Sequence, residues 1–148
     1  MTLGELAHRR QVEAEDALGM PLSLTWDIGP YEHFKKKRGF GVTFHSHRNP
    51  QWGECHIRLS EKLLRSTQPR QDGIIRHELG HVIDLQTTPH MLDSWAASRG
   101  VRLPPQAHGE LRADAIAEAV WGEPLRYDKD TVQSTCCGVA RRPAHLGA

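Results

Sequence analysis

The sequence predicts one α+β domain in which a small mixed sheet of three to four strands packs against helices. Two observations support this prediction. Apolar residues recur with helical spacing near the N-terminus, occupy short strand-like segments in the middle, and return to helical spacing in the second half. The length of 148 residues suits one domain, and 38% of the residues are hydrophobic, which is enough for a buried core.

The first half of the chain contains the predicted strands. Residues 2–18 have leucines and alanines at near-helical spacing, and the following Gly-Met-Pro run ends that helix. Residues 22–28, 40–44 and 54–59 are predicted strands, and the first and last of them alternate between two faces. In the last strand Cys55, Ile57 and Leu59 face one way.

The second half is predicted to be helical. Ser60 suits the N-cap of a short helix over residues 61–66, and Pro69 suits the first position of a helix that runs to about residue 86. A polar loop follows, after which Pro105 could open an alanine-rich helix that ends at Gly122. We expect residues 1–124 to form the domain and residues 125–148 to form a partly irregular C-terminal tail.

Charge and composition exclude several classes of protein. The net charge is only +1, so we expect neither nucleic acid nor a membrane surface as the main partner. The basic run of residues 35–38 is expected in a solvated turn. No apolar run reaches the roughly 20 residues of a membrane helix. The N-terminus lacks the apolar stretch of a secretory signal, which predicts a cytoplasmic protein or one that leaves the cell by another route.

Cysteine usage points to a reducing compartment. The three cysteines are odd in number and lack the spacing of a disulfide framework. We expect Cys136 and Cys137 to be free thiols.

Histidine is enriched, with ten copies, and two of them form the clearest pattern. His77 and His81 are four residues apart on a predicted helix, so their rings project from one face, one turn apart. Two imidazoles in this arrangement can bind one tetrahedral zinc ion, and Glu78 beside them could reach a metal-bound water. Gly80 is unfavourable inside a helix, so a close neighbour or the metal site itself should explain it. An apolar stripe on the other side lets this helix pack in the core: Ile75, Leu79, Val82 and Ile83.

A catalytic zinc site needs a third protein ligand and an open position. The best candidate is Glu110 on the next predicted helix, and the alternative for Glu110 is a solvated carboxylate favoured by the helix dipole. Asp114, one turn further on, could accept the outer N–H of His77 and fix its tautomer. The alternative for Asp114 is an ion pair with Arg112 or Arg76.

The run His77-Glu78-Leu79-Gly80-His81, followed by Glu110 and Asp114, resembles the gluzincin branch of zinc peptidases. The short layout is similar to the minigluzincins and to phage-repressor-cleaving intracellular metallopeptidases, and the resemblance covers about residues 54–121. It implies a zincin-like fold, in which the sheet packs on the active-site helix and a following glutamate helix. It also implies Zn²⁺ as the cofactor, His77, His81 and Glu110 as its ligands, and hydrolysis of a peptide or protein substrate with Glu78 as general base.

The implied mechanism leaves two roles to be filled. The strand over residues 54–59, if it is the sheet edge beside the site, would hold an extended substrate by backbone pairing. The candidates for stabilising the oxyanion are His90, His108 and Tyr127. The sequence makes no prediction of substrate specificity, oligomeric state or latency.

The alternative function is a non-catalytic regulatory protein that binds zinc and a partner on the same fold. The intact Glu78 argues against this alternative. His45 and His47, two residues apart, could bind metal but are more simply explained as polar residues at a strand end.

Overall fold

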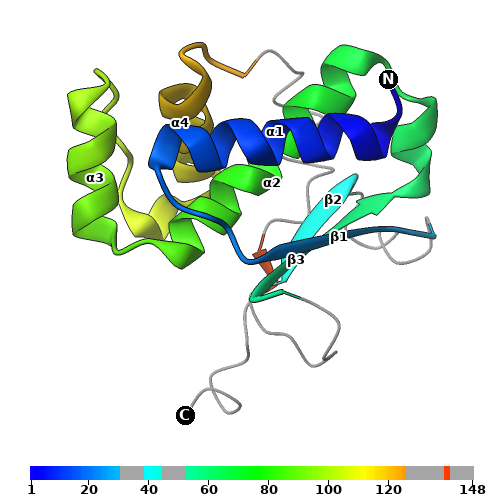
Figure 1. Ribbon diagram of the computed structural model, residues 1–148, viewed down its shortest axis with the longest axis horizontal. Helices are drawn as coiled ribbons and strands as arrows, with labels where there is room; N and C mark the ends of the chain where they lie inside the picture. Colours follow the sequence, from blue (N-terminus) through cyan, green and yellow to red (C-terminus); the bar gives the residue numbers. More distant parts are fainter. Residues whose placement is uncertain (31–38, 45–52, 126–138, 141–148) are drawn as a thin grey trace.

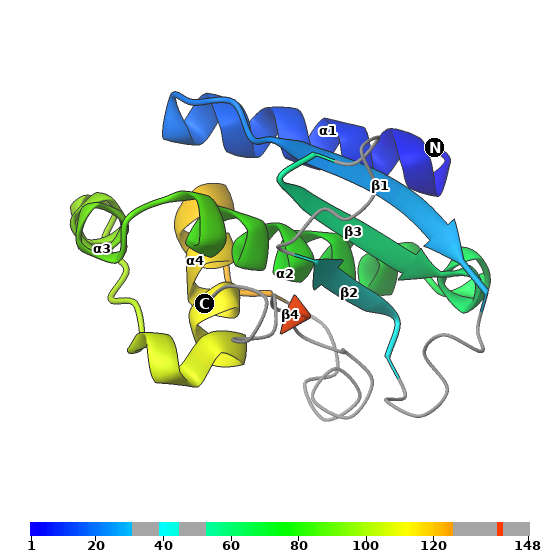
Figure 2. The same ribbon diagram turned by 90° about the horizontal axis from the view of Figure 1, so that it is seen from below.

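A computed structural model describes residues 1–30, 39–44, 53–125 and 139–140 of the chain. Within these residues four α-helices and a mixed sheet form an α+β fold, as the sequence predicts. Helices α1 (Leu3–Leu18) and α2 (Gln68–Gln86) lie side by side, and α3 (Pro89–Ser98) lies at the end of the molecule away from the strands (Figures 1 and 2). None of the helices in this part of the chain is long and apolar enough to cross a membrane.

The sheet has the strand order β1-β3-β2-β4. Strand β3 (Cys55–Ser60) pairs in parallel with β1 (Leu24–Gly29) and antiparallel with β2 (Gly41–Phe44). The expectation that residues 54–59 form a substrate-binding edge is therefore wrong, because both hydrogen-bonding edges of β3 are occupied by neighbouring strands. The outer edge of β2 carries the two-residue β4 (Val139–Ala140), which belongs to the predicted C-terminal tail.

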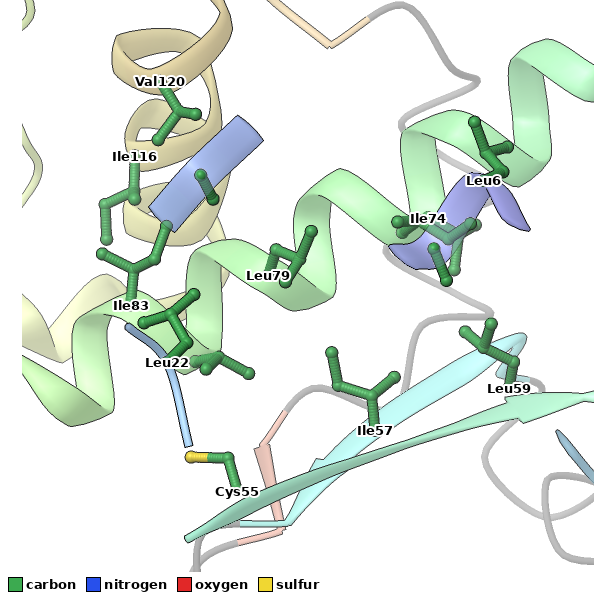
Figure 3. Close-up of a cluster of buried hydrophobic side chains, with 14 of the residues drawn as sticks. Leu6, Leu22, Cys55, Ile57, Leu59, Ile74, Leu79, Ile83, Ile116 and Val120 are labelled. Atoms are coloured by element: carbon green, nitrogen blue, oxygen red, sulfur yellow. The ribbon is translucent and has the colours of Figure 1, made fainter. Parts of the chain in front are cut away.

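The core lies between the sheet and the two long helices. Cys55, Ile57 and Leu59 are almost fully buried on the face of β3 that points toward α2. Figure 3 shows Ile57 and Leu59 directed at Leu79 and Ile74 of α2. The predicted common face of these three residues is confirmed, because all three belong to the core cluster, whereas His56 on the opposite face is buried as well.

Local signals set the ends of several helices. Thr2 caps α1, with its hydroxyl accepting from the Glu5 N–H at 3.1 Å, and Gly19 ends the helix with φ +68°. Ser60 caps the next segment as predicted, although that segment (Glu61–Arg65) is a 3₁₀-helix. Helix α2 begins at Gln68, one residue before the predicted start at Pro69.

Helix α3 occupies residues that the sequence analysis assigned to a polar loop. Its first residue is Pro89, and Leu92 and Ala96 on one face are buried in the molecule. The surrounding prolines and Gly100 resemble loop punctuation, and one short apolar face against the core was enough to form a helix among them.

Helix α4 (Gly109–Trp121) starts four residues later than the predicted start at Pro105. A short 3₁₀-helix, Gln106–His108, precedes it, and Gly122 ends it with φ +78°, as predicted. Glu110 therefore lies in the first turn of α4.

Candidate metal centre

Helix α2 presents His77 and His81 from a fully buried stretch. Their side chains are 1% and 3% exposed, and their rings meet edge to face with centroids 4.7 Å apart. The four-residue spacing places both rings on one side of the helix, while Leu79 and Ile83 enter the core on another side. Core packing of α2 therefore fixes the direction of both imidazoles.

Helix α4 supplies the third member of the site. Oε2 of Glu110 lies 2.8 Å from Nε2 of His77, and Oε1 lies 3.1 Å from Nε2 of His81. Burial by itself would raise the pKa of the Glu110 carboxyl, but the two adjacent imidazoles outweigh burial and hold this pKa well below its ordinary value. Glu110 is thus an anion directed at two imidazole nitrogens.

These three side chains could hold a metal ion. One ligand atom from each of His77, His81 and Glu110 lies within 4.8 Å of the others. The two nitrogen–oxygen distances of 2.8 and 3.1 Å are close to the edge of about 3.3 Å in a tetrahedron of zinc–ligand bonds. Nε2 of His81 is buried and makes no hydrogen bond of suitable geometry among the residues that the structure describes, as expected of a nitrogen whose lone pair is directed at an ion. Two imidazoles and a carboxylate suit zinc.

The outer nitrogen of His77 is held by a second carboxylate. Nδ1 of His77 lies 2.7 Å from Oδ1 of Asp114, one turn after Glu110 on α4. The two arginines considered as partners of Asp114 bind other acids: Arg112 binds Asp84 and Asp93, and Arg76 lies 3.1 Å from Asp72. Asp114 is therefore placed to hold the Nδ1 proton of His77, which leaves Nε2 directed at Glu110 and the ion site.

A close crossing of α2 and α4 brings the ligands together. A Cβ atom on Gly80 would overlap the backbone of Ala113, whose carbonyl carbon would lie only 2.9 Å away. Only glycine permits this approach, which answers why a poor helix former stands between the two histidines. The crossing point is one residue before Asp114 and three after Glu110, so it sets the position of both carboxylates.

Arg112 joins α4 to the two preceding helices and to the segment before α4. Its side chain is 2% exposed and donates to Oδ1 of Asp84 and of Asp93, both at 2.9 Å, and to the Pro104 carbonyl at 2.8 Å. These partners belong to α2, α3 and the segment before α4. This role of Arg112 was not predicted from the sequence. Arg112 is the one basic residue of α4, and it follows directly on Leu111 in an alanine-rich helix, which was the available signal, because a buried guanidinium requires carboxylate or carbonyl partners.

Glu78 lies under strand β2 and is fully buried. The hydroxyl of Thr43 donates to Oε1 of Glu78 at 2.7 Å. Two residues earlier on the same face, Gly41 leaves room for the Glu78 stem: a Cβ there would lie 3.2 Å from Cγ of Glu78. Neither residue was predicted from the sequence, because no local pattern relates Thr43 to a side chain 35 positions further along the chain, or Gly41 to the same side chain.

The other sequence candidates lie elsewhere or outside the described part of the chain. His90 and His108 are exposed, on the first turn of α3 and just before α4, and no hydrogen bond or ion pair among the described residues joins them to the three ligands. The remaining candidates lie outside the residues that the structure describes: Tyr127, His45, His47, Cys136, Cys137 and residues 35–38. Cys55 is a fully buried free thiol whose pKa burial raises to about 11, so it is unreactive.

The fold and site define an α+β protein with a two-histidine, one-glutamate group that could hold a metal ion. No protein-family model, curated protein or solved structure matches the chain.

Proposed function

We propose that this protein is a zinc-dependent metallopeptidase with a zincin-like fold, acting on a peptide or protein substrate. The observation that carries the proposal is the convergence of His77, His81 and Glu110 on one point, with Glu78 on the turn between the two histidines. A non-catalytic metal site has no need of an acid at this position, whereas hydrolysis requires a base beside the ion.

Each residue of the site has a distinct task in this reaction. Bound zinc would make its water more acidic and polarise the scissile carbonyl. His77 and His81 present their Nε2 lone pairs, and Glu110 contributes a carboxylate oxygen and one negative charge. Asp114 keeps the proton of His77 on Nδ1. Glu78 accepts the proton of the attacking water on its carboxylate and passes it to the leaving amine.

The test is the Glu78→Gln variant beside the wild-type protein. We expect both to hold about one zinc per chain, and the variant to hydrolyse an unfolded protein substrate roughly 10² to 10⁴ times more slowly, because it cannot accept the proton. Metal content is measured by atomic emission and hydrolysis by release of labelled peptides. Glu5→Gln, at an exposed position on α1, is the matched control. Wild-type protein that binds no zinc would contradict the proposal, as would full activity in Glu78→Gln.

The complete burial of Glu78 favours a second candidate function, a zinc-binding regulatory protein on the same fold. In that case binding to a partner would persist in Glu78→Gln and be lost in His81→Ala, since only the second change removes a metal ligand. For the peptidase, both variants lose the biological activity.

A further inference from the structure

The hydroxyl of Thr43 makes a specific contact with the proposed base. Thr43 and Glu78 are both 0% exposed, and the Thr43 Oγ1 to Glu78 Oε1 distance is 2.7 Å. The same hydroxyl lies 3.4 Å from the Glu78 backbone carbonyl oxygen, so Thr43 contacts both the side chain and the backbone of the proposed base. A threonine hydroxyl has one proton to donate, and a carboxylate can only accept, so the direction of this bond is fixed.

Strand β2 is paired on both sides where it makes this contact. Thr43 pairs with Ile57 of β3, the central strand, and Ile57 is fully buried. Gly41 pairs with Leu59 and shares the face of Thr43, where its missing side chain admits the Glu78 stem. One strand face thus supplies the space for the Glu78 side chain at one position and a hydrogen-bond donor at the next.

Fixing the rotamer of a carboxylate has a chemical consequence. A glutamate side chain has three rotatable bonds, and proton transfer requires its oxygen within about 2.6–3.2 Å of the donor. A displacement of about 1 Å can cost a hundredfold in rate. A hydrogen bond that selects one rotamer of Glu78 therefore affects the rate of the chemical step more than the binding of substrate.

We propose that Thr43 is a positioning residue, which holds the Glu78 carboxylate in the orientation that proton transfer requires. This inference rests on the proposed function. Thr43 touches neither substrate nor metal in this role and acts only through Glu78.

The experiment compares Thr43→Val, which removes the hydroxyl at nearly constant shape, with Thr43→Ser, which keeps it. We expect Thr43→Val to lower kcat by roughly tenfold to a hundredfold, with KM and zinc content unchanged, and Thr43→Ser to recover most of the loss. In a Glu78→Gln background Thr43→Val should cause no further loss, because the group it positions is already inactive. Thr25→Val is the matched control, since that hydroxyl binds His56 on the other face of the sheet.

A second readout does not depend on hydrolysis. In crystals of the zinc-loaded proteins, Glu78 should occupy one rotamer in the wild type and several in Thr43→Val. A single unchanged rotamer in Thr43→Val overturns the inference, even if the wild type hydrolyses no substrate tested. Wild-type kcat in Thr43→Val overturns it while leaving the proposed peptidase intact, and loss of zinc from Thr43→Val assigns Thr43 to folding of the metal site instead.

Discussion

The imidazole of His77 lies between two carboxylates, Glu110 on one side and Asp114 on the other. The hydrogen bond to Asp114 fixes the tautomer of His77. Asp114 therefore determines whether the Nε2 lone pair of His77 is directed at the ion site. We expect Asp114→Asn to weaken zinc binding by roughly 10- to 100-fold, measured by competition with a chromogenic chelator. The exposed Asp16→Asn on α1 should leave the affinity unchanged. An affinity within about twofold of the wild type in Asp114→Asn would rule out this role.

His56 gives the fold a predictable acid sensitivity. Its ring is 2% exposed, with Nδ1 2.7 Å from the Thr25 hydroxyl and Nε2 3.1 Å from Oδ1 of Asp27. Burial lowers the pKa of His56, and the opposing effect of Asp27 restores only part of it. The unfolded chain therefore takes up this proton more readily than the folded protein, so the associated stability is complete above about pH 6.5 and is lost as the pH falls below it.

We expect the free energy of unfolding to decrease from pH 7 to pH 5, and to decrease less in His56→Gln. Urea denaturation of both proteins in one metal-free buffer measures the difference, since the metal ligands then contribute equally to each. The exposed His8→Gln on α1 is the matched control. Parallel curves for wild type and His56→Gln would show that another group causes the acid sensitivity.

At the scale of elements, the site depends on how closely α2 and α4 approach. Gly80→Ala would place a methyl group against the backbone of Ala113, and two helix backbones cannot give way as a side chain can. We expect α4 to move outward, zinc affinity to fall at least about tenfold, and stability to fall by about 1–3 kcal/mol.

Gly4→Ala is the matched control for this crossing. A Cβ at Gly4 on α1 would meet nothing within 4 Å, so alanine should leave zinc affinity unchanged and leave stability equal or slightly higher. Equal zinc affinity in Gly80→Ala and the wild type would show that α4 can retreat without moving Glu110.

The Thr43–Glu78 and Gly80–Ala113 contacts join elements that are far apart in the sequence. The strand order is a further relation of this kind. Strand β3, expected at an edge, lies between two other strands, and β2 contacts the proposed base through Thr43. None of these relations follows from hydrophobic periodicity, which predicts an element and its buried face but not its neighbours.

At the scale of the whole molecule, the ligands come from two helices, so an ion would join α2 to α4. Anything that binds the folded state alone stabilises it by mass action. Free zinc at a concentration one hundred times its Kd should raise the free energy of unfolding by about 2.7 kcal/mol and Tm by roughly 5–10 °C. A chelator should reverse both changes. Differential scanning calorimetry measures the shift, which should be absent in His81→Ala. An equal shift in His81→Ala would place the bound zinc elsewhere.

The sequence by itself determined the α+β class, the Ser60 cap, the core-facing residues of β3 and the common face of His77 and His81. The last three depend on residues within about four positions of one another, where helical and strand geometry set the distances, and the fold class follows from the order of such local patterns along the chain. The spacing of Glu110 and Asp114 also identified the acids that the structure brings to His77.

Only the tertiary structure decided which strand lies at the centre of the sheet, that residues 89–98 form a helix, and that Thr43 binds Glu78. It also explained Gly80, through a backbone 33 positions away. These outcomes depend on packing between distant segments, where the burial of a whole face outweighs the preference of any single residue.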